Sequence, residues 1–229
     1  MNPHELIKKY ISGISQGLAT SLIIKSKAGY GKTELTLLTL KELGFSEGIH
    51  YSYYNNYFTP LEFYKTLEET NQLQKPRLLI LDDVEQILTD KKIIGLLKSA
   101  LWETPNGKRK VCWTSGTWKI KNKEIEFQGR IIFLLNELKK KNPLIQALID
   151  RSLFFEFELT NQEKISLMME RTELPYHDIP IQKRKEIVEF ISKVAGNNPN
   201  LSLRVLPKIY QLYVLSPNHY KELAIGLLK

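Results

Sequence analysis

Residues 26–33 carry the strongest chemical signal in this chain. They read Ser-Lys-Ala-Gly-Tyr-Gly-Lys-Thr and match the phosphate-binding pattern G-x-x-x-x-G-K-[ST] except at Ser26, which replaces the first glycine. Glycines in such a loop let backbone N–H groups surround a phosphate, and the helix that follows adds a partial positive charge. Lys32 is expected to reach the β- and γ-phosphates of ATP, and the Thr33 hydroxyl to bind Mg²⁺. The residues predicted to bind nucleotide are Ser26, Lys27, Ala28, Gly29, Tyr30, Gly31, Lys32, Thr33 and Glu34.

A pair of carboxylates about fifty residues further on matches the second half of a nucleotide site. The apolar run Leu78–Leu81 ends in Asp82 and Asp83. In a phosphate-loop enzyme the first acid lies near Mg²⁺ through its water shell, and the second polarises the attacking water. The alternatives are a chance glycine turn before a lysine, and two acids that begin a solvated turn and cap the next helix.

The elements that must position these residues follow an α/β pattern. Over the first 160 residues, apolar β-branched runs alternate with amphipathic segments, which predicts a parallel sheet covered by helices on both faces. Residues 161–229 show only helical patterns and predict a small all-helical lid domain. The predicted domains are therefore 1–160 and 161–229. Predicted strands cover 21–25, 50–55, 77–81, 130–135 and 153–159, and predicted helices cover 4–15, 32–43, 59–70, 91–101, 143–150, 161–171, 182–194, 201–215 and 219–228.

With residues 27–33 as Walker A and 78–83 as Walker B, the sequence resembles the AAA+ P-loop ATPases, in particular their helicase-like or helicase-loader-like group. The resemblance extends from about residue 14 to residue 215. Members of that family commonly have glutamate where this chain has Asp83, and Glu85 is a less well-spaced substitute base. The resemblance implies ATP and Mg²⁺ as cofactors, with Thr33 and Asp82 on the metal side.

Three further residues take roles only through this resemblance. Asn136, after the run Arg130–Leu135, matches a polar sensor at a strand end, and its alternative is a turn residue. Arg151 matches an arginine finger that reaches the ATP of a neighbouring subunit, and its alternative is a cation at a helix C-terminus. Arg204 matches a second sensor on the lid, and its alternative is a surface arginine. The implied catalytic residues are Asp83, Asn136, Arg151 and Arg204.

A segment between the second Walker motif and the sensor is a candidate DNA contact. Residues 107–129 read as a β-hairpin with Trp113 and Trp118, and some helicase-like AAA+ proteins carry a hairpin at this place. Cations beside aromatic rings suit a nucleic-acid backbone and its bases. The alternative is a solvated hairpin with one tryptophan packed on the core. The candidate DNA-binding residues are Lys108, Arg109, Lys110, Lys119, Lys121 and Lys123.

Other clusters favour structural roles. The run 139–141 of three lysines either flanks the same surface or forms a solvated loop. Tyrosines at 51, 53, 54 and 57 are interpreted as sheet-edge and packing residues. The scattered histidines and the single Cys112 predict neither a zinc site nor an internal disulfide.

Composition bounds the function classes. The net charge of +8 raises the expectation of a nucleic-acid partner, although a lysine-rich solvated surface explains it equally well. No apolar run approaches the ~20 residues that cross a bilayer, and no signal core is present, so a cytoplasmic protein is expected.

The predicted function is an ATP-hydrolysing AAA+ protein that acts on DNA or on a replication complex, as a helicase-like motor or loader. Such a compact chain fits a phage, plasmid or mobile-element protein. Its expected partners are other copies of itself, in a ring or filament and most simply a hexamer, together with DNA and a replication or helicase protein. Two alternatives stay open: a protein-remodelling ATPase, for which Tyr57-Phe58 resembles a pore loop, and an ATP-dependent assembly switch with negligible turnover.

Overall fold

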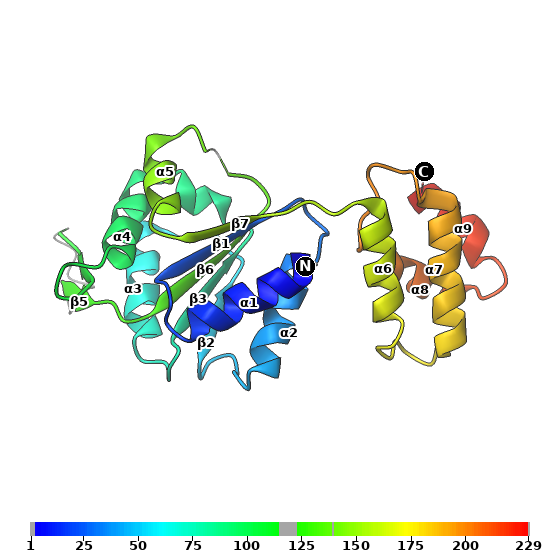
Figure 1. Ribbon diagram of the computed structural model, residues 1–229, viewed down its shortest axis with the longest axis horizontal. Helices are drawn as coiled ribbons and strands as arrows, with labels where there is room; N and C mark the ends of the chain where they lie inside the picture. Colours follow the sequence, from blue (N-terminus) through cyan, green and yellow to red (C-terminus); the bar gives the residue numbers. More distant parts are fainter. Residues whose placement is uncertain (1–2, 115–122, 139, 229) are drawn as a thin grey trace. The chain divides into compact units, whose positions relative to one another are not determined.

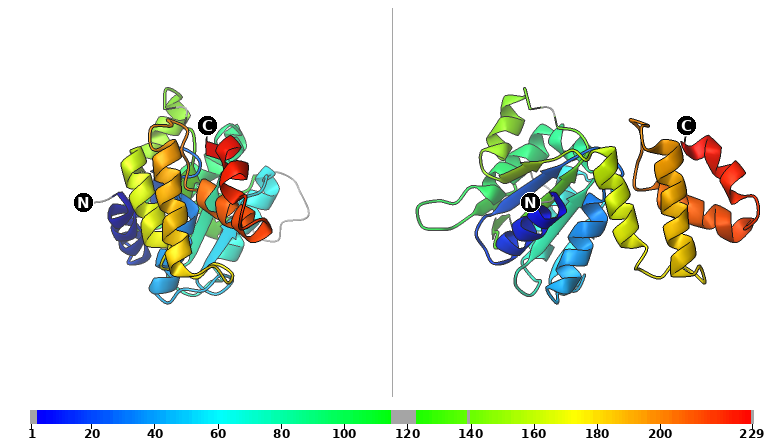
Figure 2. Two further views of the ribbon diagram at one scale, coloured as in Figure 1. Left: turned by 90° about the vertical axis from the view of Figure 1, so that its right-hand side faces the viewer. Right: turned by 45° about the vertical axis from the view of Figure 1, so that its right-hand side comes forward.

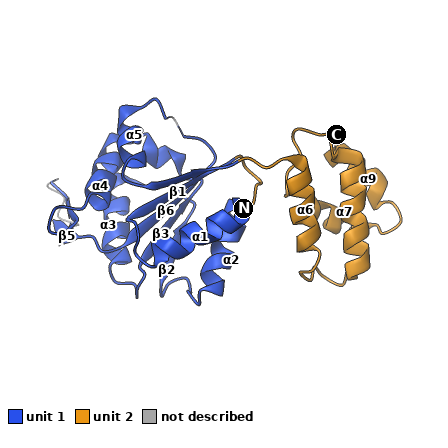
Figure 3. Ribbon diagram, in the orientation of Figure 1, with its two compact units in different colours: residues 1–26, 32–157 blue, residues 27–31, 158–229 orange. Residues whose placement is uncertain are grey.

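A computed structural model describes residues 3–114, 123–138 and 140–228 of the chain. The chain divides into two compact units (Figure 3). The sheet unit comprises Met1–Ser26 and Lys32–Phe157, and the helical unit comprises Lys27–Gly31 and Glu158–Lys229. The middle of the predicted phosphate loop thus belongs, by its contacts, with the C-terminal helices. Whether residues 1–160 and 161–229 act as separate functional domains stays a prediction.

The sheet unit is built on a five-stranded parallel sheet with strand order β2-β3-β6-β1-β7 (Figure 1). This confirms the predicted α/β class. Its strands are β1 (Ser21–Lys25), β2 (Tyr51–Tyr54), β3 (Leu78–Asp82), β6 (Arg130–Leu135) and β7 (Leu153–Glu156), and its helices are α1 (Pro3–Ser15), α2 (Lys32–Glu42), α3 (Pro60–Thr70), the 3-10 helix η1 (Glu85–Leu88), α4 (Lys91–Leu101) and α5 (Pro143–Ile149).

Helices cover both faces of this sheet, with α1 and α2 on one face and α3, α4 and α5 on the other (Figure 1). Successive side chains of a strand point to opposite faces of the sheet. Because helices cover both faces, the side chains on both faces are apolar. Leu79, Leu81, Ile131 and Phe133 belong to the core cluster under α3, α4 and α5. The intervening strand residues, such as Ile80, are equally buried and point to the α1 and α2 face. Near-continuous apolar strands are therefore required here.

Parallel pairing places the carboxyl ends of all five strands at one edge. Lys25 of β1 is in register with Leu135 of β6, and Asp82 of β3 with Leu134. The residues that follow β1, β3 and β6 consequently emerge side by side. In open α/β sheets, this edge is where ligands bind.

The helical unit contains α6 (Asn161–Arg171), α7 (Ile181–Ala195), α8 (Val205–Leu215) and α9 (Tyr220–Leu228), and α6 and α7 run side by side (Figure 2). A capping box starts α6: Thr160 accepts a hydrogen bond from the Glu163 N–H at 3.2 Å, and the Glu163 carboxylate accepts from the Thr160 N–H at 2.7 Å. None of the helices in the described part of the chain is long and apolar enough to cross a membrane.

Two predicted boundaries were wrong. The helix expected over 201–215 begins only at Val205, because the preceding residues follow an irregular path and bond to the phosphate loop. The strand expected over 153–159 ends at Glu156.

The predicted hairpin is present as the antiparallel strands β4 (Lys110–Cys112) and β5 (Glu124–Glu126). Trp113 packs against Tyr64, with ring centroids 5.7 Å apart, as the structural alternative expected. Of the residues assigned to DNA contact, Lys119 and Lys121 lie outside the described residues, as do Trp118 and Lys139.

Arg109 is a correction to the predicted DNA surface. Its side chain is 7% exposed, donates to the Ala100 carbonyl oxygen at 3.1 Å and lies 5.2 Å from the Phe127 ring centroid. Burial lowers the pKa of this guanidinium below its ordinary value. Arg109 therefore joins the start of the hairpin to α4 and does not face a DNA backbone.

The neighbouring lysines are exposed but have acidic partners. Lys108 pairs with Glu126 at 3.3 Å, and Lys110 pairs with Glu124 at 2.7 Å. The basic character of this strand pair is thereby reduced, and Lys123 is the third exposed lysine in its described part.

Two substitutions of adjacent residues, Arg109→Ala and Lys110→Ala, compare a buried cation with an exposed one. Arg109→Ala should lower the free energy of unfolding by about 2 kcal/mol, because it removes a buried hydrogen bond and an aliphatic stem. Lys110→Ala removes one exposed ion pair and should have a much smaller effect on the free energy of unfolding. Urea denaturation measures both values. Equal effects would contradict the structural role of Arg109.

Candidate nucleotide-binding site

Lys32 occupies the centre of the site although it is a buried cation. Its side chain is 4% exposed, and Nζ donates to the Ser26 carbonyl oxygen at 3.0 Å and to Asn136 Oδ1 at 2.8 Å. Lys32 is the first residue of α2, so backbone geometry fixes its place beside the strand ends. A buried ammonium group needs such acceptors, and phosphate oxygens are stronger acceptors of the same kind.

Ser26, where the phosphate-loop pattern has glycine, is compatible with the observed backbone. Positive φ angles within the loop occur at Gly29 (80°) and Gly31 (83°), and Ser26 is not among the described non-glycine residues with positive φ. Its N–H donates to the Leu135 carbonyl oxygen at 3.2 Å and extends the β1–β6 ladder by one residue. The loop thus has glycine where left-handed backbone requires it.

Thr33 and Asp82 are brought together as the sequence predicts. The Thr33 hydroxyl donates to Asp82 Oδ2 at 2.7 Å. Asp82 ends β3 and is 5% exposed, and its other oxygen, Oδ1, is buried with no hydrogen-bond partner among the described atoms. A buried carboxylate oxygen without a donor is costly, and a hydrated cation satisfies it. A hydroxyl and a carboxylate are hard oxygen ligands, so these residues fit Mg²⁺.

Asp83 and Asn136 form the next contact, since Asn136 Nδ2 donates to Asp83 Oδ1 at 2.6 Å. The Asp83 backbone is left-handed, with φ 52°, which aspartate tolerates better than most residues. Desolvation, and then the nearby charge of Asp82, raise the pKa of Asp83, whereas Lys32 and Asn136 act in the opposite direction. A carboxylate with a raised pKa is a better proton acceptor than an ordinary aspartate.

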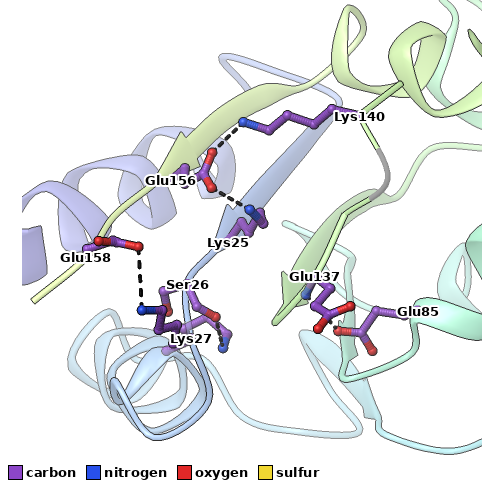
Figure 4. Close-up of polar contacts among 9 residues, drawn as sticks. Lys25, Ser26, Lys27, Glu85, Glu137, Lys140, Glu156 and Glu158 are labelled. Carbon is purple, nitrogen blue, oxygen red and sulfur yellow. Dashed lines mark hydrogen bonds and ion pairs between the residues drawn. The ribbon is translucent and has the colours of Figure 1, made fainter. Parts of the chain in front are cut away.

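Glu85 has a positioning role and is not arranged as a substitute base. Its Oε1 accepts the Asn136 backbone N–H at 2.8 Å. The same oxygen accepts the Glu137 N–H at 3.5 Å (Figure 4). Because Asn136 contacts both Lys32 and Asp83, Glu85 fixes the backbone that carries this amide.

A second charged cluster joins the strand ends beside the loop. Glu156, at the end of β7, pairs with both Lys25 and Lys140 (Figure 4). These two lysines lower the pKa of Glu156, with the Lys140 hydrogen bond the larger influence. The cluster connects β1 and β7 to the segment after β6. Its member on β1, Lys25, immediately precedes Ser26.

The tip of the phosphate loop is packed within the helical unit. The Leu203 N–H donates to the Gly29 carbonyl oxygen at 3.1 Å, and a Cβ on Gly29 would lie 2.0 Å from Ser202 Oγ. Tyr30 is buried, and Lys164 Nζ lies 4.8 Å from its ring centroid. A glycine is thus needed at position 29 both for the close approach of the Ser202 side chain and for the positive φ angle. Lys27 and Ala28 are exposed, with Lys27 Nζ 3.9 Å from Glu158 (Figure 4).

Arg204 is exposed at the position that precedes α8, and its Cδ lies 3.7 Å from where a Gly29 Cβ would be. The predicted second sensor is therefore beside the loop within the helical unit. Glu34 lies in the first turn of α2 and is exposed.

Arg151 is not brought to these residues. It follows α5, and its carbonyl oxygen accepts from the Ser21 hydroxyl at 3.3 Å, at the amino end of β1. Its Nη1 donates to the Ala147 carbonyl oxygen at 2.5 Å. Arg151 thus lies at the sheet edge opposite to Asp82, where it cannot serve the site of its own sheet unit.

Tyr53 is the site residue that sequence reasoning missed. Its hydroxyl donates to Asp82 Oδ2 at 2.7 Å, so packing does not describe its role. Burial is the main cause that raises the pKa of this phenol, followed by the bond to Asp82. Tyr51 and Tyr54 do pack, whereas Tyr57 is 70% exposed. No sequence signal pointed to this role, because it depends on the pairing of β2 with the strand that ends in Asp82.

No protein-family model matches the sequence. The chain is 31% identical over 237 residues to a 36.7 kDa protein, itself uncharacterized, from the nrdC-mobD intergenic region of Enterobacteria phage T4, covering 94% of this chain and 70% of that protein.

Solved structures with the same fold include two from Thermotoga maritima. The RuvB Holliday junction branch migration motor matches with a TM-score of 0.61 at 13% identity, covering 99% of this chain and 68% of that one. Domain III of the replication initiation protein DnaA matches with a TM-score of 0.60 at 13% identity, covering 98% and 91%. The chain therefore belongs to one family with the phage T4 36.7 kDa protein, and it shares the fold of the RuvB motor and of DnaA domain III.

Proposed function

We propose that this chain binds ATP with Mg²⁺ at the carboxyl edge of its sheet and hydrolyses it, and that it acts on DNA or on a DNA-replication complex as a helicase-like motor or loader. One observation carries the ATPase proposal. Three segments far apart in the sequence contribute Lys32, Thr33, Asp82, Asp83 and Asn136. Asn136 is hydrogen-bonded to both Lys32 and Asp83, and Thr33 is hydrogen-bonded to Asp82.

The proposed division of labour follows from the contacts of each residue. Lys32 exchanges its neutral acceptors for phosphate oxygens, and Thr33 and Asp82 hold Mg²⁺, which when bound offsets phosphate charge. Asp83 accepts a proton from the water that attacks the γ-phosphorus while the bond to the bridging oxygen breaks. Asn136 holds Asp83 and, through its amide, orients the water or the γ-phosphate.

Arg151 supports an oligomeric enzyme. Its place at the far sheet edge suits a guanidinium that stabilises the transferred phosphoryl group in a neighbouring copy. Arg204 beside Gly29 suits a lid residue that responds to the γ-phosphate. We propose a ring or filament of identical subunits, with a hexamer as the simplest ring.

DNA is the proposed substrate because the solved structures with this fold include a branch migration motor and a domain of a replication initiation protein, and because the net charge is +8. The described part of the hairpin contributes Lys108, Lys110 and Lys123 to such a surface. A replication or helicase protein is the proposed partner.

Protein remodelling is the less favoured function. Its candidate pore residues differ in exposure, since Tyr57 is exposed whereas Phe58 is buried and packs against Phe63. An assembly switch with negligible turnover would follow if Asp83, one methylene shorter than glutamate, fails as a proton acceptor.

Two substitutions test the electrostatics of Asp83 in metal-free buffer, because they should shift its pKa in opposite directions. Asp82→Asn removes a negative charge and should lower the Asp83 pKa, whereas Lys32→Ala removes a positive charge and should raise it. Carboxyl carbon NMR titration measures both. Shifts of the same sign in both variants contradict the proposed electrostatics.

ATP turnover with and without single- and double-stranded DNA tests the function directly. Turnover should appear with Mg²⁺, rise at least severalfold with DNA, and fall by about 10²-fold or more in Lys32→Ala, because Lys32 contacts the transferred group. Lys141→Ala is a matched lysine control. Turnover without DNA stimulation favours protein remodelling, and nucleotide binding without turnover favours the switch.

The shared site makes a separate prediction for Arg151. Arg151→Ala should lose turnover by about 10³-fold while ATP binding stays within twofold of wild type. Mixing this variant with Lys32→Ala should restore part of the activity, because an intact phosphate loop then meets an intact arginine from a neighbour. Mixed samples that stay as inactive as the separate variants would argue against a finger supplied between subunits.

A further inference from the structure

We infer that Tyr53 is a positioning residue that orients the Asp82 carboxylate for Mg²⁺. The inference rests on the proposed nucleotide site and adds a residue that neither Walker motif contains. Tyr53 acts through Asp82, and its hydroxyl is the only part of the side chain that the inference requires.

The reach of the tyrosine explains why this residue type is needed. Tyr53 on β2 is in register with Ile80 on β3, whereas its hydrogen-bond acceptor, Asp82, lies two residues further along β3. Two residues of strand span about 6.6 Å, which only a long side chain covers. A phenol carries its donor at that distance on a rigid ring, so the contact is directional.

The two donors leave one oxygen of the carboxylate for the metal. Thr33 Oγ1 and Tyr53 Oη both donate to Asp82 Oδ2, each at 2.7 Å. Oδ1 stays buried without a hydrogen-bond partner among the described atoms. Two donors on one side fix the rotation of the carboxylate and would leave Oδ1 available to a hydrated Mg²⁺.

The two donors differ in what else they do. The Thr33 hydroxyl would also provide a lone pair to a bound Mg²⁺, so its removal would take away a ligand as well as a donor to Asp82. Tyr53 lies on another strand and touches Asp82 only through its hydroxyl in the described hydrogen bonds. Loss of that hydroxyl should therefore loosen the carboxylate without removing any ligand.

Tyr53→Phe tests the inference, with Tyr57→Phe as the matched control because the Tyr57 ring is exposed in the same segment. Calorimetry on the full chain gives the ADP dissociation constant in excess Mg²⁺ and in EDTA. Tyr53→Phe should reduce the Mg²⁺-dependent gain in ADP affinity about tenfold, the loss expected for one hydrogen bond to a charged group. Affinity in EDTA should stay within twofold, and Tyr57→Phe should change neither value.

The same comparison in an Asp82→Asn background isolates the pair. Tyr53→Phe should have no further effect there, because the carboxylate that it orients is gone. An unchanged Mg²⁺-dependent gain, an equal loss in Mg²⁺ and in EDTA, or an undiminished effect in the Asp82→Asn background would each overturn the inference. Absence of ADP binding by the wild type would instead defeat the proposed nucleotide site.

Discussion

The buried ammonium group of Lys32 is the constraint on which the site depends. A charge in this position must be surrounded by acceptors, and the chain supplies them from the end of β1, through Ser26, and from the residue after β6, Asn136. Those acceptors are adjacent only because the strands are parallel and in register. The sheet order, the apolar faces and the two layers of helices therefore all serve to bring a few polar atoms to one edge.

Local patterns predicted the fold, and they named several residues that the structure brings together at one edge of the sheet. The apolar runs, the glycine loop and the acids after β3 each carry their signal within about ten residues, so Lys32, Thr33 and Asp82 were predicted from these patterns, whereas Asn136 was predicted from the family resemblance. Arg109 shows the limit of this reasoning. In the sequence it is one of three consecutive cations, and nothing local distinguishes the one that turns inward to Ala100.

The contacts of Tyr53 and Glu85 could not be predicted, for a different physical reason. Each acts on a residue of a neighbouring strand, so its role depends on register and rotamer, which no single segment encodes. The fold itself persists in the Thermotoga proteins at 13% identity. Layer packing tolerates extensive exchange of apolar residues, whereas a hydrogen bond such as that between Tyr53 and Asp82 does not.

The assignment of Lys27–Gly31 to the helical unit means that the C-terminal helices are not a detachable appendage. Gly29 and Tyr30 owe their surroundings to Ser202, Leu203 and Lys164. A truncated chain ending near residue 157 would keep every Walker residue and still leave the middle of the loop without the packing that shapes it. The smallest piece that keeps the observed shape of this loop is therefore set by tertiary contacts, and it extends well beyond the sheet.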